Sequence, residues 1–163
     1  MKIVKRMALA LGLMLVGIAV VAPIGPLPGF FIGGDPKPAP ETWPDTAGVD
    51  EITLRVPGTL PRSVIIWLIE YDNELYIVGR SSSTWVNMIG DASPVAMRLG
   101  DDTYPLEAVL MRSGWQPMMK AYVDKYEPDY PKIVAGFPAV SEAAGEISVF
   151  QLVRDTDSLT RAR

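Results

Sequence analysis

The feature that most limits the fold of this chain is its uncharged N-terminal stretch. Lys2, Lys5 and Arg6 make the first residues positively charged, and residues 7–34 then contain no charged side chain. Residues 7–22 are entirely apolar or small, so the chain opens with the charged and apolar regions of an export signal. A buried core helix is a weaker interpretation, because such helices rarely lack a polar face.

Residues 1–22 fit either a cleaved signal peptide or an uncleaved signal-anchor. Val20 and Ala22 form the best cleavage site, but Pro23 follows and is expected to hinder a protease that binds its substrate in extended form. Residues 3–22 match the roughly 20 helical residues that a bilayer core requires. We favour the anchor, a transmembrane helix with its N-terminus in the cytoplasm and the rest of the chain outside. Cleavage would give a secreted protein.

The rest of the chain is acidic. The whole sequence has 15 Lys plus Arg and 19 Asp plus Glu. Removing the three N-terminal cations leaves 15 − 3 = 12 against 19, a charge of −7. An acidic domain repels phosphate backbones and anionic lipids, so we expect no nucleic-acid partner and no electrostatic adhesion to membranes.

Two residue types are missing altogether, namely cysteine and histidine. Their absence excludes disulfides, thiol catalysis, Ser-His-Asp catalysis and metal sites built on thiolate or imidazole. No metal site is therefore expected. Chemistry would have to come from carboxylates, Lys, Tyr, Ser or a bound cofactor, and the sequence identifies no catalytic residue.

Composition divides the chain beyond residue 22 into three parts. Residues 23–49 are rich in proline and glycine and predict a semi-rigid linker. Trp43, inside this linker, fits either the membrane interface or packing on the following domain. Residues 50–154 predict one globular domain with a modest core, and residues 155–163 form a polar tail.

The pattern of residues 50–154 is dominated by hairpins. Alternating or continuous apolar runs predict strands over residues 51–56, 63–70, 75–78, 94–99, 103–111 and 146–153. Helical periodicity and end signals predict two helices, residues 85–89 and 115–126, the first capped by hydroxyl residues and ended by Gly90. This order predicts a mainly β (α+β) fold, a small antiparallel barrel with two helices at its margin.

Residues 62–99 show a more specific similarity. The strands RSVIIWLI (62–69) and ELYIVG (74–79) are followed by the helix WVNMI (85–89) and by DASPVAMRL (91–99). In order and spacing these segments resemble the deazaflavin- and flavin-dependent nitroreductase family, which are split β-barrels related to pyridoxamine-phosphate oxidases. YVDKY and VFQL, further along the chain, also fit that family. The similarity covers most of the predicted domain.

The resemblance implies a deazaflavin or FMN cofactor and a set of residues that would bind it. Phosphate contacts would fall on one arginine and a run of hydroxyl residues, and the ring would be bordered by a tryptophan and an asparagine. These residues are Arg62, Ser81, Ser82, Ser83, Thr84, Trp85 and Asn87. Without the resemblance, they also fit a strand start, a polar capping loop and a core tryptophan.

The sequence departs from the family at the phosphate loop. The family places Lys-Ser-Gly just before the strand arginine, whereas this chain has VPGTLP at residues 56–61. The lysine is absent, and Pro57 and Pro61 have no N–H to offer an anion.

Two functions follow from these observations. The first is a binding or interaction module on a split barrel that has lost its cofactor, and the missing phosphate loop motivates it. The alternative is a flavin- or deazaflavin-dependent reductase of a small or lipid-soluble acceptor. A location outside the membrane favours the first, because reduced nicotinamide and deazaflavin pools are held in the cytosol.

Several aromatic residues suit a ligand pocket as well as a core. Tyr122, Tyr126 and Tyr130 could line a pocket for a quinone or another ring, although helical stripes usually pack. Trp67 lies on a strand that is apolar on both faces and is expected in the core. A small-molecule ligand is thus one expected partner, and a homodimer is expected from the family alone.

Overall fold

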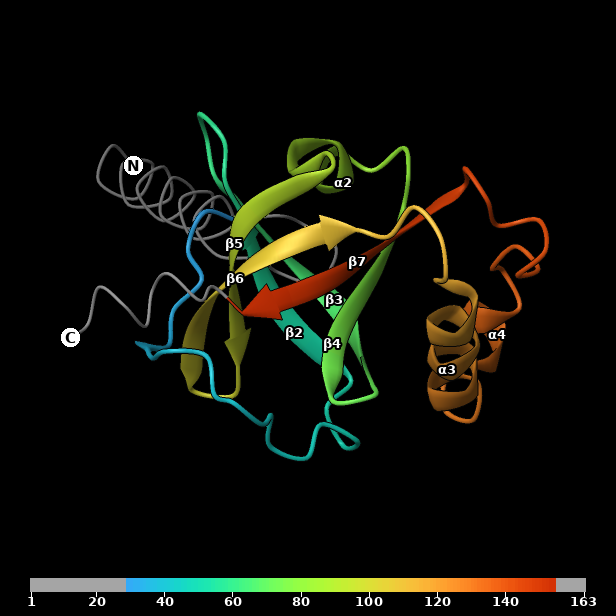
Figure 1. Cartoon of the computed structure of the whole chain (residues 1–163), viewed down its shortest axis with the longest axis horizontal. Helices are drawn as coiled ribbons and strands as arrows, with labels where there is room; N and C mark the ends of the chain where they lie inside the picture. The colour runs from blue at the N-terminus through green and yellow to red at the C-terminus, as the bar shows by residue number, and fades with distance from the viewer. Residues whose placement is uncertain (1–28, 155–163) are drawn as a thin grey trace, which may run out of the picture.

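The computed structural model describes residues 29–154. The predicted targeting helix and the polar tail lie outside this range. Within it, no helix combines the length and apolar character needed to span a membrane. Figure 1 shows a barrel with one short helix over an end and two further helices packed beside it.

Six antiparallel strands form the barrel, and together they confirm the predicted mainly β fold. They are β2 (Glu51–Val56), β3 (Arg62–Tyr71), β4 (Glu74–Arg80), β5 (Ala92–Leu99), β6 (Asp102–Leu110) and β7 (Ile147–Arg154). Their order is β6-β5-β2-β3-β4-β7, and pairing of β6 with β7 closes the circle. Closure removes most of the free edges that an open sheet would expose.

Two tight turns set the register of the hairpins. Asp72 and Asn73, between β3 and β4, have φ values of 53° and 61°. Asp and Asn tolerate this left-handed region better than other non-glycine residues, and paired positive φ values suit a two-residue hairpin turn. Gly100, between β5 and β6, has a φ of 60°.

Within residues 29–154, three helices accompany the barrel where the sequence predicted two. They are α2 (Thr84–Ile89), α3 (Gln116–Tyr126) and α4 (Pro131–Val134). α4 was missed because a single turn is too short to show helical periodicity. Ser83 does precede α2 as predicted, but its side chain makes no capping hydrogen bond.

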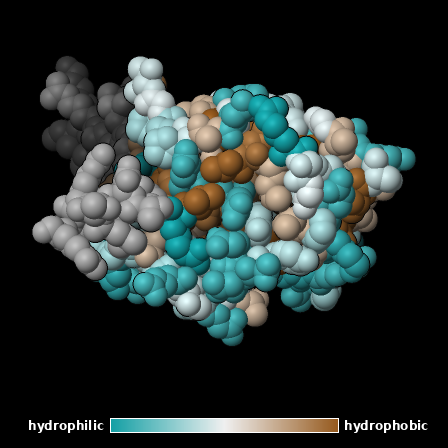
Figure 2. Space-filling view, in the orientation of Figure 1, coloured by the Kyte–Doolittle hydropathy of each residue, from teal (hydrophilic) through white to brown (hydrophobic). Residues whose placement is uncertain are grey.

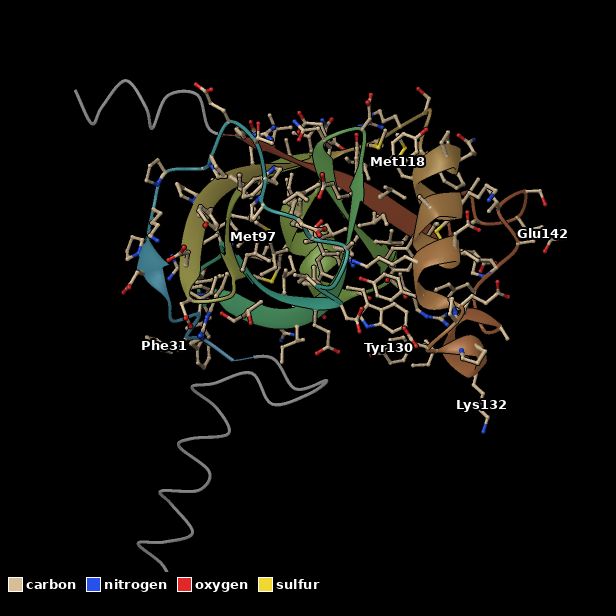
Figure 3. All side chains as sticks on the ribbon, turned by 90° about the horizontal axis from the view of Figure 1, so that it is seen from below. Phe31, Met97, Met118, Tyr130, Lys132 and Glu142 are labelled. Atoms are coloured by element: carbon tan, nitrogen blue, oxygen red, sulfur yellow. The ribbon has the colours of Figure 1, made fainter. Side chains whose placement is uncertain are left out.

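The barrel interior is filled by side chains. Residues on the inner face of alternate strand positions include Leu54, Leu68, Ile77, Met97 and Phe150, all fully buried. Met97 lies inside the ring of strands in Figure 3. The interior is therefore a packed core and not a channel.

A second core lies between the barrel's outer face and α3. Trp67 projects from β3 into it, and its ring stacks on Tyr126 with centroids 4.2 Å apart and planes at 12°. Tyr130 and Tyr122 lie at centroid distances of 4.9 Å and 5.9 Å from Trp67. The expectation that Trp67 packs in a core is met, although the side chain is only half-buried.

Residues 29–49, predicted as part of a linker, pack on the barrel. Gly29 pairs with Ser63 of β3 at positions that β4 does not reach, and β1 (Asp35–Pro36) pairs in parallel with the start of β6, before β7 joins it. Both contacts satisfy backbone groups that closure leaves unpaired. Trp43 is only 4% exposed and belongs to the inner core. In this range, the spacer interpretation is replaced by a structural strap.

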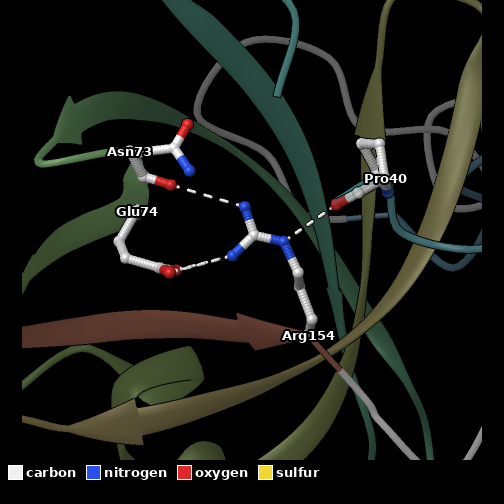
Figure 4. A network of polar contacts seen from close by, with 4 residues as sticks. All are labelled: Pro40, Asn73, Glu74 and Arg154. Atoms are coloured by element: carbon white, nitrogen blue, oxygen red, sulfur yellow. Dashed lines mark hydrogen bonds and ion pairs between the residues drawn. The ribbon is translucent and has the colours of Figure 1, made fainter. Parts of the chain in front are cut away.

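Arg154, at the end of β7, holds this strap in place (Figure 4). Its guanidinium donates to both carboxylate oxygens of Glu74 at 2.9 Å and to the carbonyl of Pro40 at 2.8 Å. The same group lies 5.3 Å from the centre of the Trp43 ring. Trp43 meets Tyr104 edge-on at 5.4 Å. One cation thus joins the strap, the β3–β4 hairpin and β7.

Candidate functional site

Arg62, the predicted phosphate ligand, is the first residue of β3. Its backbone pairs with Val56 at the end of β2, and its side chain is half-buried. The connection before it passes close to α2, because a Cβ on Gly58 would lie 2.8 Å from the end of the Met88 side chain. Since Pro57 and Pro61 lack an N–H, this connection offers few donors to a phosphate.

The hydroxyl run at residues 81–84 uses several of its donors within the protein. The Ser81 N–H donates to the Glu146 carbonyl at 2.9 Å, and its hydroxyl lies 3.1 Å from that of Ser148. The Ser83 N–H donates to the Arg80 carbonyl at 2.8 Å. A phosphate bound here would have to displace these internal hydrogen bonds.

Trp85 and Asn87 are also engaged in the fold. The Trp85 ring covers Gly79 of β4 so closely that a Cβ at Gly79 would lie 2.2 Å from it, and it packs near Phe150 at 6.1 Å. Asn87 is exposed, and its side-chain amide donates to the Ser83 carbonyl at 3.0 Å. The core interpretation of Trp85 therefore holds.

The predicted cofactor residues lie on two separate segments of the fold. Arg62 begins one strand, while Ser81 and Ser83 follow another and already have partners. α2 has six residues, which gives its N-terminus little to offer an anion. The assignment of these residues to a cofactor phosphate stays a prediction from the sequence.

A cavity lies elsewhere, at the edge of the second core. It has a volume of about 190 Å³ and opens between β4, the start of β7 and α3. Its walls are mainly apolar. The lining residues are Val78, Gly79, Arg80, Met119, Tyr122, Phe137, Pro138, Glu146 and Ile147.

Tyr122 supplies a polar group in this cavity. Its side chain is 5% exposed, and burial raises the pKa of its hydroxyl well above the ordinary value of 10.0. The buried side-chain atoms without a partner in residues 29–154 are Trp43 Nε1 and Ser63 Oγ, so the Tyr122 hydroxyl is not among them, and the Tyr126 hydroxyl has several partners. A neutral phenol in an apolar cavity is a hydrogen-bond donor available to a ligand.

Two opposite charges stand at the cavity's mouth. Arg80 and Glu146 belong to its lining, and both residues are exposed. Solvent screens exposed charges, so they contribute more to selecting a ligand's orientation than to affinity. Their opposite signs leave the mouth without net charge.

The sequence pointed to only one residue of this cavity. Tyr122 stood out as part of the helical stripe, while Phe137 and Glu146 lie in irregular segments with no distinctive pattern. Gly79 could have been noticed, because glycine inside a strand often marks a close approach of another group. Of the other predicted pocket tyrosines, Tyr126 is buried against β3 and Tyr130 donates to Asp50 at 3.0 Å.

A second, polar cleft of about 410 Å³ lies beside Lys125. The ammonium of Lys125 donates to the carbonyls of Thr46, Val49 and Leu68 at 3.2, 2.6 and 3.0 Å. Burial lowers the pKa of this lysine. Because its donors already connect α3, β3 and the strap, we assign Lys125 a structural role. In the described part of the chain, no three Asp or Glu side chains cluster as metal ligands would.

Comparison with solved structures finds barrels of related shape. A NimC/NimA family protein from Clostridium acetobutylicum is 14% identical, with a TM-score of 0.44, over 63% of this chain and 73% of that one. An FAD- and heme-binding protein from Mycobacterium smegmatis is 15% identical, with a TM-score of 0.48, over 68% and 63%. A pyridoxamine 5'-phosphate oxidase-related, FMN-binding protein from Nostoc punctiforme is 11% identical, with a TM-score of 0.42, over 67% and 71%.

These values are too low to place the chain in a family or to transfer a cofactor to it. The chain also spans only 63% of the Mycobacterium smegmatis protein. No known family and no curated protein matches the sequence. The fold and the cavity define a closed six-stranded barrel with a lateral, mainly apolar site, and the nitroreductase and deazaflavin assignments stay predictions from sequence.

Proposed function

We propose that this protein is a membrane-tethered binding domain, held outside the cytoplasm, that takes a small aromatic molecule with a hydrogen-bond acceptor into the cavity beside α3. The observation that carries this proposal is Tyr122, a buried tyrosine that lines a mainly apolar cavity. The N-terminal apolar segment supports the tether.

The size of the cavity limits the ligand. Typical ligand pockets enclose about 300–1,000 Å³, and this cavity measures about 190 Å³. A single substituted ring fits such a volume better than a dinucleotide or a complete flavin. Apolar walls favour the ring, and the phenol favours a carbonyl or similar acceptor on it.

The proposal can be tested with two probes that differ by one acceptor, acetophenone and ethylbenzene. We expect the full-length protein in lipid nanodiscs to bind acetophenone more tightly, with NMR shifts centred on Tyr122 and Phe137. A neutral hydrogen bond contributes about 1 kcal/mol, or about five-fold in Kd. Tyr122→Phe should therefore remove the preference for acetophenone, and Tyr130→Phe, outside the cavity, should not.

A substitution that fills the cavity provides a second test of the proposed ligand binding. Val78→Phe places a ring in the space that the ligand would occupy and should abolish binding of both probes, with thermal unfolding as the check on folding. The proposal is rejected if neither probe binds the unmodified protein, or if both bind Val78→Phe as well as they bind the original.

A reductase remains the alternative, and absorbance spectra separate it from the proposal. We expect the purified protein to carry no yellow chromophore and to retain neither FMN, FAD nor a deazaflavin after gel filtration. This follows from the donors of Ser81 and Ser83 being engaged in the fold. A retained chromophore would favour the reductase and contradict the proposed function.

A further inference from the structure

Three exposed large apolar side chains lie on the two chain segments that meet at the start of β3. Phe30 and Phe31 are 41% and 63% exposed, and Leu60 is 70% exposed. Phe30 follows Gly29, whose N–H and carbonyl both bond to Ser63, and Leu60 lies three residues before Ser63. The Gly29–Ser63 pairing therefore joins the two segments that carry these side chains, which we call the apolar end (Phe30, Phe31 and Leu60).

The one face drawn in Figure 2 is mostly hydrophilic, and its hydrophobic areas are separate from one another. Phe31 lies at the side of the barrel away from α3 and α4 in Figure 3, where Lys132 marks the opposite side. Ile133, 52% exposed on α4, therefore lies far from the apolar end.

The short length of chain between the N-terminal segment and the barrel determines which surface the apolar end faces. If residues 3–22 cross the bilayer, the steps from Ala22 to Gly29 reach at most about 25 Å even when fully extended. A domain of this size has a radius of gyration of about 13 Å, so the tether is shorter than or similar to the domain's width. Because Gly29 is fixed to Ser63 by two hydrogen bonds of 2.9 and 2.6 Å, the start of β3 is the part of the barrel nearest the membrane.

The residue types match a membrane interface. Aromatic and leucine side chains insert among lipid carbonyls and acyl chains, and nearby arginines extend toward the phosphates. Arg62 follows Leu60 closely, and Arg55 is exposed on β2 opposite Ser63. The domain as a whole is acidic, so insertion of apolar side chains and not general electrostatic attraction must drive the contact.

We propose that the apolar end docks onto the outer leaflet of the membrane that holds the N-terminal segment, inserting Phe30, Phe31 and Leu60. This proposal rests on the tether of the proposed function. It gives Arg62 a lipid phosphate as its partner in place of a cofactor phosphate. Docking leaves the cavity beside α3 open to the aqueous side.

The absence of cysteine from the sequence makes a clean experiment available. The full-length chain carrying Leu60→Cys is labelled with an environment-sensitive nitrobenzoxadiazole dye and reconstituted into phosphatidylcholine vesicles. Phe31→Cys is a second test position, and Ile133→Cys is the matched control. Lipids brominated close to the headgroup should quench the dye at positions 60 and 31 and leave position 133 unquenched.

Each outcome of the quenching experiment supports or overturns a stated part of the proposal. Equal quenching in neutral vesicles and in vesicles with phosphatidylglycerol supports insertion, while quenching in anionic vesicles alone overturns it in favour of charge attraction. A protein that floats with vesicles but shows no quenching at positions 60 and 31 overturns docking and keeps the tether. Failure to float at all rejects the tether itself. Disulfide cross-linking between Leu60→Cys copies, without quenching, assigns the apolar end to a second copy and overturns the proposal.

Discussion

Gly79 lies at the boundary between the two cores, where there is no room for a side chain. It lies on β4 between the Trp85 ring and the cavity, and an added Cβ would come within 2.2 Å of that ring and 2.8 Å of Val86. We expect Gly79→Ala to reduce the free energy of unfolding by roughly 1–3 kcal/mol, as overpacking of a close-packed interior does. Urea denaturation followed by tryptophan fluorescence would measure it.

Gly48→Ala is the control for this substitution. An added Cβ at Gly48 meets nothing within 4 Å, so only the gain from a stiffer unfolded chain is expected there. Equal stability of the two alanine variants would contradict the close packing of Trp85 on β4. In Gly79→Ala, displacement of Trp85 should also weaken acetophenone binding, because Gly79 lines the cavity.

At the scale of single residues, the sequence predicted where a side chain lies in the fold better than it predicted what that side chain contacts. Trp85 and Asn87 were correctly placed on a short helix, yet Trp85 packs in the core and Asn87 bonds to its own helix. Ser81 and Ser83 are partnered through contacts with Glu146, Ser148 and Arg80. Long-range partners of this kind leave no local pattern, so a hydroxyl run resembles a ligand site whether or not its donors are taken.

Among the elements, α3 is attached to β3 by the hydroxyl of Tyr126 as well as by Lys125. The Tyr126 hydroxyl accepts from the Leu68 N–H at 3.0 Å and lies 2.7 and 2.6 Å from the carbonyl oxygens of Asp50 and Leu68, to either of which it can donate. Burial raises the pKa of Tyr126 above the ordinary value of 10.0. Removing the hydroxyl leaves buried backbone groups without this partner, so Tyr126→Phe should cost about 1–3 kcal/mol at pH 7.

The raised pKa predicts a pH dependence with a definite sign. Tyr126 stays protonated in the folded protein at pH values where the tyrosine of the unfolded chain ionises. Its contribution to the free energy of unfolding is therefore fully present below about pH 10 and is lost as the pH rises further. Unfolding free energies measured up to pH 11 should fall less steeply for Tyr126→Phe, by up to about 1.4 kcal/mol per pH unit. An identical slope for Tyr126→Phe and the unmodified protein would contradict the prediction.

The elements themselves were largely predictable, and the exceptions have physical causes. The six barrel strands follow from alternation and from the turns at Asp72, Asn73 and Gly100. β1 (Asp35–Pro36) was missed because it has two residues, one of them proline, and owes its conformation to pairing with β6. α4 is likewise a single turn, attached through Val134 to the second core.

For the whole molecule, the main lesson concerns the strap. Proline and glycine made residues 29–49 resemble a spacer, but the strap packs on the closed barrel, supplies Trp43 to the interior and pairs with β3 and β6. Composition reports the conformational preference of a segment and says nothing about a neighbouring surface that it covers. Only the exposed backbone edges of the finished barrel show where this segment belongs.

Truncated chains test whether residues 29–48 act as a structural strap or as a linker. A chain starting at residue 29 keeps Trp43 and the contacts of Arg154 with Pro40 and Glu74, and we expect it to unfold cooperatively as the full-length protein does. A chain starting at residue 49 loses Trp43, and large-to-small changes at buried aromatic residues already cost about 3–5 kcal/mol. Since total stability is typically about 5–15 kcal/mol, this shorter chain should be partly unfolded at 25 °C. Circular dichroism and hydrogen exchange would show it.

Trp43→Ala in the chain that starts at residue 29 tests whether the loss of stability comes from this one side chain. It should reproduce much of the destabilisation of the shorter chain, whereas Trp43→Phe should cost less, because the Trp43 N–H is buried without a partner in the described residues and phenylalanine removes that unpaired group. Equal stability of the two truncated chains would mean that residues 29–48 are a spacer after all. The anchoring of Gly29 at Ser63, on which membrane docking depends, would then have no energetic basis, so this measurement also bears on how the barrel sits at the bilayer.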